Sequence, residues 1–373
     1  MTDPKVKEQV MIMDESLLYG ITVEEPDEEA RARARSRFDS LAKPIDALGD
    51  FEDIICDIAA MTGDDKPDIS QKALVIMCAD NGVVKEGVSQ TDSGVTASVA
   101  RLMGKGASSA GVLTCGQNIR IVPVDIGMDT DEVIPGVTDR KIAKGTGNIA
   151  VSSAMTNEQC LAAIDAGIGI VRDLVSEGTR IIATGEMGIG NTTTSTALLC
   201  ALTGKDPADV TGRGAGLSDE GLDRKTEVIR KALTLHSLAH CSWDVTPEYA
   251  FCALCAVGGL DIAGLTGVFT GCAMYRIPAV IDGLISAVAA LTAHYIVKGC
   301  GNYMIASHKG KERGSAAALE ILGKKPVIDA DMALGEGCGA VMLFPLLDMA
   351  MKLYDQGTSF DDTDIDKYER FEA

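Results

Sequence analysis

The sequence of 373 residues predicts an α/β protein built on a parallel sheet. Three short apolar runs, at 73–80, 119–127 and 180–188, each close on small or acidic residues, as buried strands do. Helical segments of about 10–20 residues separate them, and this alternation is typical of parallel strands joined by crossover helices. Hydrophobic residues make up 46% of the chain and aromatic residues only 4%, so we expect an aliphatic core.

Helices are expected on either side of these strands. Within residues 27–62, apolar and charged residues recur at helical spacing, and Pro44 predicts a break between two helices. The apolar segment 277–297 is interrupted by Asp282 and His294, which favours a buried core helix over a membrane span.

The charge of the chain excludes some classes of partner. A net charge of −20 without a long run of Lys and Arg argues against nucleic-acid binding. The first twenty residues lack the basic start and apolar stretch of a secretory signal, so we expect a cytoplasmic protein without a membrane partner.

Two close pairs of potential metal ligands occur. Cys252 and Cys255 lie in an apolar stretch without a second ligand pair at zinc-site spacing, which favours core packing. His236 and His240 would share a helix face, but no carboxylate third ligand is obvious beside them. We therefore expect no metal site.

Polar residues gather where the three predicted strands end. Asp80 and Asn81 follow the first strand, Asp125 and Gly127 end the second, and residues 186–194 follow the third. Loops that leave the carboxyl ends of parallel strands line the ligand crevice of such sheets. We expect the binding site there.

The segment GEMGIGNTTT, residues 185–194, is a candidate anion site. Gly188 and Gly190 allow close backbone approach, and Asn191 and Thr192 can cap the helix that follows. Free N–H groups at a helix N-terminus bind phosphate without a lysine. A glycine turn with a helix cap explains the same pattern, because the full dinucleotide and Walker motifs are missing.

Glu186 of this segment and two further segments supply charged groups. The Glu186 carboxylate can bind another part of a ligand, such as a sugar hydroxyl or a cationic ring, and a mononucleotide carries both. Gly214 and Lys225, in TGRGAGLSDEGLDRK, can bind a phosphate. Glu336 lies between glycines in MALGEGCGA, where it is either a general base or a solvent-facing glutamate favoured by the helix dipole.

Together these segments resemble the nicotinate-nucleotide:dimethylbenzimidazole phosphoribosyltransferases over nearly the whole chain. The resemblance runs from DSLAKPIDALGDFED through DNGVVKEGVS, VDIG, GTGNIA and GEMGIGNTTT to SHKGKERG and LGEGCGA. It implies transfer of the phosphoribosyl group of nicotinate mononucleotide to an aromatic base such as 5,6-dimethylbenzimidazole. The products are nicotinate and the α-ribazole 5′-phosphate used in the nucleotide loop of cobamides (vitamin B12), and no cofactor or metal is required.

The resemblance also implies an architecture. It consists of a large Rossmann-like parallel-sheet domain, residues 71–345, and a small helical domain formed from both chain ends. Residues 1–70 would contribute an N-terminal helical segment to the small domain, and residues 346–373 a C-terminal helix and acidic tail. The family is dimeric, with its site between subunits, so Pro26 would reach across to the base pocket of the partner.

Site residues follow from the resemblance as well. Glu336 corresponds to the catalytic base that deprotonates the attacking ring nitrogen, and Glu186 to a second functional carboxylate beside the ribose. The implied phosphate and ribose contacts are Gly188, Gly190, Asn191, Thr192, Gly214, Lys225, Ser307 and Gly310. The implied base pocket comprises Pro26, Thr91, Val99, Met187 and Leu334.

Departures from the family pattern leave the acceptor open. Thr91 and Asp92 occupy pocket positions, Val99 stands where a glutamine is common, and Asn81 replaces a frequent histidine. A phenol-activating homologue and a noncatalytic subunit of a heteromeric phosphoribosyltransferase are the alternatives. The glycine-flanked Glu336 favours an enzyme, because a noncatalytic subunit has no chemical reason to keep it.

Overall fold

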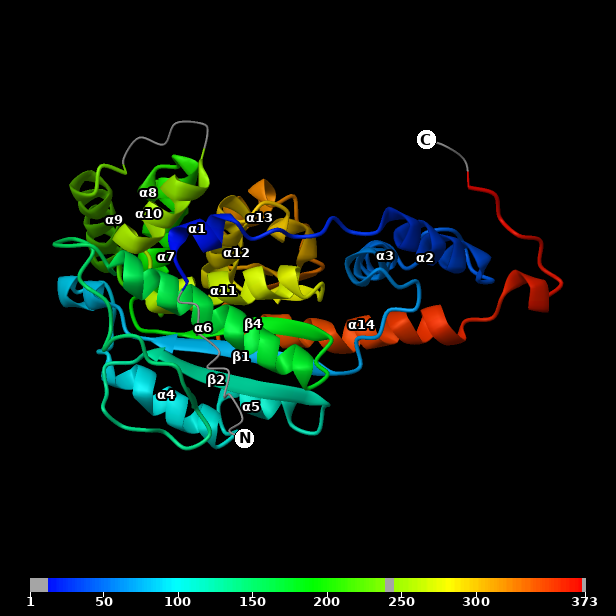
Figure 1. Cartoon of the computed structure of the whole chain (residues 1–373), viewed down its shortest axis with the longest axis horizontal. Coiled ribbons are helices and arrows are strands. Elements are labelled where there is room, and N and C mark those ends of the chain that lie inside the picture. Colours follow the sequence, from blue (N-terminus) through cyan, green and yellow to red (C-terminus); the bar gives the residue numbers. More distant parts are fainter. Residues whose placement is uncertain (1–12, 239–244, 371–373) are drawn as a thin grey trace, which may run out of the picture.

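A six-stranded parallel sheet forms the centre of the computed structural model, which describes residues 13–238 and 245–370 (Figure 1). The strands are β1 (Lys72–Ala79), β2 (Ile119–Gly127), β3 (Thr138–Asp139), β4 (Ile181–Met187), β5 (Ala279–Ile281) and β6 (Met304–Ala306). Their spatial order is β3-β2-β1-β4-β5-β6. This is the doubly wound, Rossmann-like order, with its reversal between β1 and β4, and it confirms the predicted fold class.

The three predicted strands are β1, β2 and β4, each within one residue of its expected bounds. β1 is central, and its Val75 pairs with Val122 of β2 on one side and Thr184 of β4 on the other. Every residue of β1 is buried, as expected for a strand covered on both faces. β3, β5 and β6 have two or three residues each, too few to produce a recognisable periodicity.

Helices cover both faces of the sheet (Figure 1). α6 (Asn157–Ser176) and α11 (Leu260–Met274) lie on one face, and α4 (Gly94–Gly104) and α5 (Ser109–Thr114) lie on the other. Glycines bring α6 and α11 into backbone contact. A Cβ at Gly167 would lie 2.1 Å from the Gly264 carbonyl oxygen, and one at Gly267 would lie 2.0 Å from that of Ile164.

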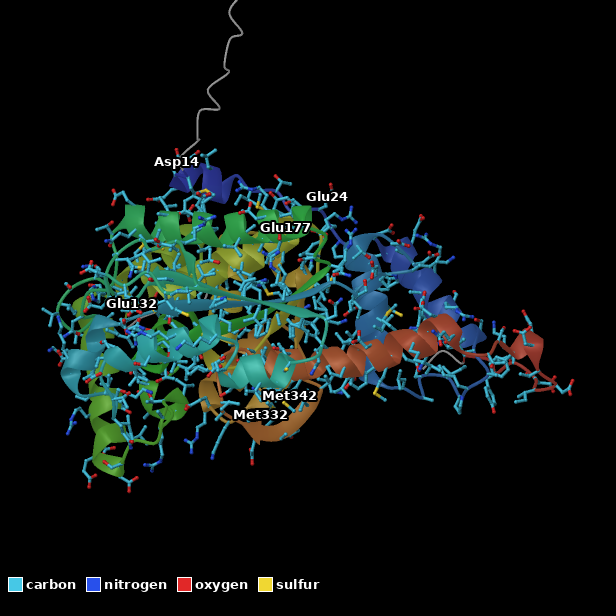
Figure 2. The ribbon with its side chains drawn as sticks, turned by 90° about the horizontal axis from the view of Figure 1, so that it is seen from below. Asp14, Glu24, Glu132, Glu177, Met332 and Met342 are labelled. Atoms are coloured by element: carbon cyan, nitrogen blue, oxygen red, sulfur yellow. The ribbon has the colours of Figure 1, made fainter. Side chains whose placement is uncertain are left out.

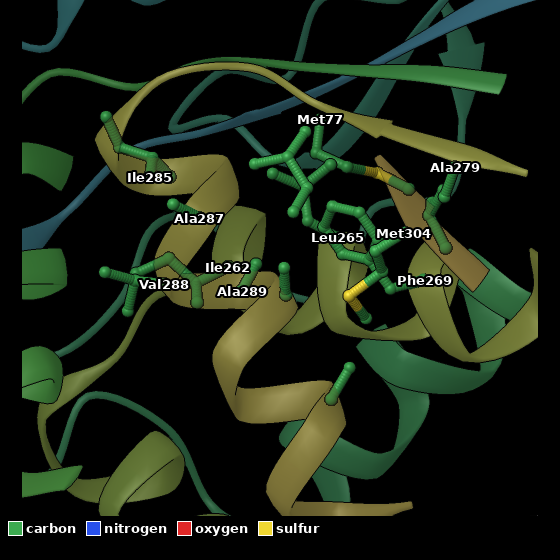
Figure 3. Close-up of a cluster of buried hydrophobic side chains, with 14 of the residues drawn as sticks. Met77, Ile262, Leu265, Phe269, Ala279, Ile285, Ala287, Val288, Ala289 and Met304 are labelled. Carbon is green, nitrogen blue, oxygen red and sulfur yellow. The ribbon is translucent and has the colours of Figure 1, made fainter. Parts of the chain in front are cut away.

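The core between sheet and helices is aliphatic, as predicted. Figure 3 shows Leu265 and Phe269 of α11 packed beside Met77 of β1 and Met304 of β6, and all four side chains are buried. Beside them runs α12 (Leu284–Ile296), the predicted buried helix. The start of the apolar segment 277–297 is different, since it forms β5.

The remaining elements surround the carboxyl edge of the sheet and its periphery. They are α7 (Asn191–Thr203), α8 (Pro207–Val210), α9 (Asp219–Leu235), α10 (Pro247–Val257), α13 (Arg313–Ile321), β7 (His308–Gly310), β8 (Ile328–Met332) and the 3-10 helices η1 (Gly82–Glu86), η2 (Cys300–Tyr303) and η3 (Phe360–Asp362). Within residues 13–238 and 245–370, no helix is both long and apolar enough to span a membrane.

A small helical lobe projects from the sheet body and contains segments from both ends of the chain (Figure 1). It comprises α2 (Glu28–Ser40) and α3 (Asp50–Thr62), the two predicted helices, together with the second half of α14 (Cys338–Gln356). Phe38 packs against Tyr354, with ring centroids 4.9 Å apart. The Arg37 Nε donates a hydrogen bond to the Tyr354 carbonyl oxygen at 3.1 Å.

The predicted division at residues 70 and 345 stays a prediction. α1 (Glu15–Tyr19) lies against the sheet body, where Tyr19 meets Phe251 of α10 edge to face. α14 runs through the second boundary without interruption, with Pro345 inside it. The described part of this segment, residues 13–70, therefore contacts both the sheet body and the small lobe.

Candidate active site

A cavity of about 200 Å³ opens beside the first turn of α7 and the carboxyl ends of β4 and β5. Of the residues predicted to form the site, the cavity lining includes Glu186, Asn191, Thr192, Gly214, Gly310 and Leu334. Glu186 belongs to the end of β4, next to the point at which the strand order reverses. Doubly wound sheets bind their ligands at such a point.

Two glycines shape the turn between β4 and α7. A Cβ at Gly188 would lie 2.4 Å from the carbonyl oxygen of Ala79, and Gly190 has a φ of 92°, in the left-handed region. Gly190 takes the N-cap position of α7, and no side chain caps that helix. The predicted capping by Asn191 and Thr192 is therefore wrong, because both side chains bond to other site residues.

The Asn191 amide joins a partly buried carboxylate, Glu186, and a buried one, Asp261. Its Nδ2 donates to the carboxylate of Glu186 and, at 3.1 Å, to Oδ2 of Asp261. Burial raises the pKa of Glu186 to about 8, and the nearby charges of Asp261, Asp282 and Glu336 act in the same direction. Burial also raises the pKa of Asp261 to about 6. The raised pKa favours the protonated form of Glu186, which can donate a hydrogen bond to a ligand.

Lys225 of α9 provides a buried positive charge at this end of the site. Its side chain is almost inaccessible, and Nζ donates to Oγ1 of Thr192 at 2.8 Å and to the carbonyl oxygen of Gly212 at 3.2 Å. Burial lowers the pKa of Lys225 to about 8, while the charge of Glu312 raises it. A Cβ at Gly214 would lie 3.5 Å from this Nζ. Lys225, Thr192 and Gly214 thus lie together, in a place suited to an anion.

The loop that carries Glu336 is folded against β4. Gly335, Glu336 and Gly337 have φ values of 82°, 58° and 78°, a run of three left-handed residues. A Cβ at Gly185 would lie 2.7 Å from the backbone of Glu336, so the loop depends on that glycine. The Glu336 Oε2 accepts a hydrogen bond from the backbone N–H of Ala110 at 3.0 Å. This partly buried carboxylate is therefore not the solvent-facing glutamate of the alternative interpretation.

Asp282 and His308, which line the cavity, were missed by the sequence analysis. Asp282 directly follows β5, and its Oδ1 accepts from the backbone N–H of Ala340 at 2.9 Å. Burial raises the pKa of Asp282, and the nearby His308 opposes that shift. Glu186 was noticed because it follows a predicted strand. Asp282 and His308 follow β5 and β6, which are too short to be recognised from the sequence.

Comparison with known proteins identifies the family. A family model described as phosphoribosyltransferase matches residues 23–365. The chain belongs to this phosphoribosyltransferase family. The nicotinate-nucleotide–dimethylbenzimidazole phosphoribosyltransferase of Ruminiclostridium cellulolyticum is 42% identical over 351 residues, 94% of this chain and 98% of the relative. The enzyme of that name from Acetivibrio thermocellus is 44% identical over 334 residues, 89% of this chain and 93% of the relative.

A solved structure supports the same family assignment. The crystal structure of the nicotinate-nucleotide–dimethylbenzimidazole phosphoribosyltransferase from Thermus thermophilus matches this phosphoribosyltransferase with a TM-score of 0.82 and 34% sequence identity. The match covers 90% of this chain and 98% of that one. The doubly wound sheet is therefore shared with a solved member of the family.

Ser307, which was predicted to contact the ligand, is buried and does not line the cavity. Its Oγ donates to the carbonyl oxygen of Ile281 at 2.6 Å and lies 2.9 Å from Nδ1 of His308. The side chain is buried between the ends of β5 and β6, whereas Gly310 lines the cavity. Its hydroxyl therefore holds the strand ends and His308 in position.

Only one of the five predicted base-pocket residues lies in the lining of this cavity. Leu334 lines the cavity, while Met187 and Val99 pack against the hydrophobic core and Thr91 is exposed. Pro26 lies near the opposite, amino edge of the sheet. The carbonyl oxygen of the nearby Glu24 accepts from the hydroxyl of Tyr303, which directly precedes β6, and the backbone N–H of Asp27 donates to the carbonyl oxygen of Ala60.

The two pairs of potential metal ligands, one of cysteines and one of histidines, lie in different surroundings. Cys255 is buried as predicted, but Cys252 is exposed, since it lies on the outer face of α10. His236 pairs through Nε2 with the carbonyl oxygen of Ile149 at 2.9 Å. His240 lies outside the described residues.

Proposed function

We propose that this chain transfers the phosphoribosyl group of nicotinate mononucleotide to an aromatic base, 5,6-dimethylbenzimidazole or a related one. The observation that carries the proposal is the cavity lined by Glu186, Thr192 and Gly214, with Lys225 bonded to Thr192, in a chain 42% identical to a relative named for this reaction. The products would be nicotinate and α-ribazole 5′-phosphate.

The site contains a group for each part of the donor. The Lys225 ammonium and the Gly214 N–H suit the 5′-phosphate, and the Glu186 and Asn191 pair suits the ribose hydroxyls. Gly188 and Gly190 form the tight turn that places Asn191 beside Glu186. The nicotinate leaving group is a pyridinium, so it departs without protonation and the main task of the site is positioning.

We assign the proton transfer to Glu336. A ring nitrogen of the base attacks C1′ of the ribose on the face opposite to nicotinate, which inverts that carbon. The bond from C1′ to the pyridinium nitrogen breaks, and its electron pair neutralises the departing ring. The Glu336 carboxylate takes the proton that the alkylated base must lose.

A homodimer would complete the base pocket. Large apolar side chains are exposed on α14, where Met342 is 44% and Met349 69% accessible, and on α5, where Val112 is 66% accessible. α14 passes α5 at Met342 (Figure 2). Such an apolar surface is typical of a protein interface. We infer that it pairs with a second copy, which brings its own Pro26 toward the acceptor.

The test is direct. The pure protein is incubated with nicotinate mononucleotide and a panel of benzimidazoles, purines and phenols, and the products are identified by mass. Release of nicotinate with formation of an α-ribotide supports the proposal, and the preferred acceptor separates benzimidazole from phenol activation. Absence of any product, with activity restored only by a paralogous partner, would support the noncatalytic alternative.

A further inference from the structure

Glu312 is a charged residue of the site that the reaction above does not use. It lies immediately before α13, and its Oε1 accepts a hydrogen bond from the backbone N–H of Gly214 at 3.0 Å. Its Oε2 is buried and, among the described residues, has no hydrogen-bond partner. The carboxylate lines both the candidate site and a neighbouring cavity of about 910 Å³.

The position of this carboxylate depends on a glycine. A Cβ at Gly212 would lie 1.3 Å from Oε2 of Glu312, so the carboxylate is seated directly against the backbone of residue 212. The carbonyl oxygen of Gly212 accepts from Nζ of Lys225. Glu312 therefore sits beside the N–H and the ammonium group assigned above to the substrate phosphate.

We propose that the Glu312 carboxylate competes with the substrate phosphate for the Gly214 N–H, and that a phosphorylated donor must displace it to bind. This inference rests on the proposed function, because it takes Gly214 and Lys225 as the phosphate contacts. One N–H cannot donate a full hydrogen bond to two anions, and two anions this close repel each other. Glu312 thus lowers the affinity of the site for phosphorylated ligands, the donor and the ribotide product alike.

Binding calorimetry with two donors tests this role. Nicotinate mononucleotide and nicotinate riboside, which lacks the phosphate, are titrated into the wild type, Glu312→Gln and Glu312→Asp. The pH is 6.5, at which the Lys225 ammonium is charged, because its pKa is about 8. Glu312→Asp keeps the charge but is one methylene too short to reach Gly214. Glu227→Gln is the matched control, since Glu227 lines only the neighbouring cavity and its side chain is 76% exposed.

We expect Glu312→Gln to lower the Kd for the mononucleotide about tenfold and to leave the Kd for the riboside unchanged. Glu312→Asp should also lower the Kd for the mononucleotide, and Glu227→Gln should change this Kd by less than about twofold. An unchanged or higher Kd for the mononucleotide, or an equal shift for both ligands, would overturn the inference alone. Equal affinity for both ligands in the wild type and in Glu312→Gln alike would instead refute the proposed phosphate site.

Discussion

At the scale of single residues, Glu186 combines a carboxylate with a mostly buried environment. A folded-state pKa of about 8, above the ordinary value of 4.5, means that the folded protein binds more protons than the unfolded chain between these two pH values. The contribution of Glu186 to stability is therefore fully present below pH 4.5 and declines as the pH rises toward 8.

Glu186→Gln should remove this decline, because the amide resembles the protonated acid. We expect the free energy of unfolding of the variant to exceed that of the wild type by about 2–5 kcal/mol more at pH 8 than at pH 5. Urea unfolding at both pH values measures it. Parallel pH dependence of the two proteins would contradict the raised pKa.

Lys225 should act on donor affinity. Lys225→Ala is expected to raise the KM for nicotinate mononucleotide roughly 10- to 100-fold, since it removes a charged hydrogen-bond donor. Because burial lowers the pKa of Lys225 to about 8, the wild-type KM should rise above pH 8 and that of the variant should not. Lys231→Ala, at an exposed position of the same helix, is the control. A change confined to the KM of the aromatic base would place Lys225 elsewhere.

Glu336 should act on the chemical step. Glu336→Gln keeps the size of the side chain but removes the base, so we expect kcat to fall about 10²–10⁴-fold. The Kd for nicotinate mononucleotide, measured by calorimetry, should stay within about twofold of the wild type. Near-normal turnover of this variant would exclude Glu336 as the base.

At the scale of elements, the loop 335–337 depends on its fit against β4. Gly337 has a φ of 78°, and a Cβ there would lie 2.4 Å from Cδ1 of Leu74 and 2.9 Å from the Thr184 carbonyl oxygen. Gly323 has a comparable φ of 63°, yet a Cβ there would meet nothing within 4 Å. Substitution at Gly323 therefore tests backbone strain alone, whereas substitution at Gly337 tests strain together with steric clash.

Gly337→Ala should therefore destabilise the protein by about 2–4 kcal/mol, against about 1 kcal/mol for Gly323→Ala. Only Gly337→Ala should also lower kcat, because it pushes the Glu336 loop off the strand. Urea unfolding and steady-state assays measure the two effects. Equal destabilisation by both substitutions would show that packing against Leu74 is unimportant.

At the scale of the whole molecule, the exposed apolar surface on α14 and α5 predicts self-association. Met349→Glu should convert a dimer into a monomer, as seen by sedimentation, and should reduce activity if the partner supplies Pro26. Val133→Glu is the matched control, because Val133 is also highly exposed, at 77%, but lies in a loop outside this surface. A monomeric wild type with full activity would refute the homodimer.

The sequence predicted the sheet well because β1, β2 and β4 are long and largely apolar. The same pattern drew attention to Glu186 and the glycine segments to Gly214, and both residues line the cavity, while their roles stay predictions. It could not locate Asp282 and His308, since β5 and β6 contain three residues each. Nor did it identify the role of Asn191, because hydrogen bonds to Glu186 and Asp261 depend on three segments that meet only in the folded chain.

The helix α14 links the two ends of this architecture. Its first residue, Cys338, lies two positions after Glu336, and its last turns lie in the small lobe against α3. Nineteen helical residues span about 28 Å, so this one helix connects the lobe with the loop of Glu336. Pro345 removes one backbone hydrogen bond near the middle of the helix, which is where we expect the helix to bend. We therefore expect a tilt of the small lobe, such as contact with another subunit would impose, to shift the Glu336 carboxylate.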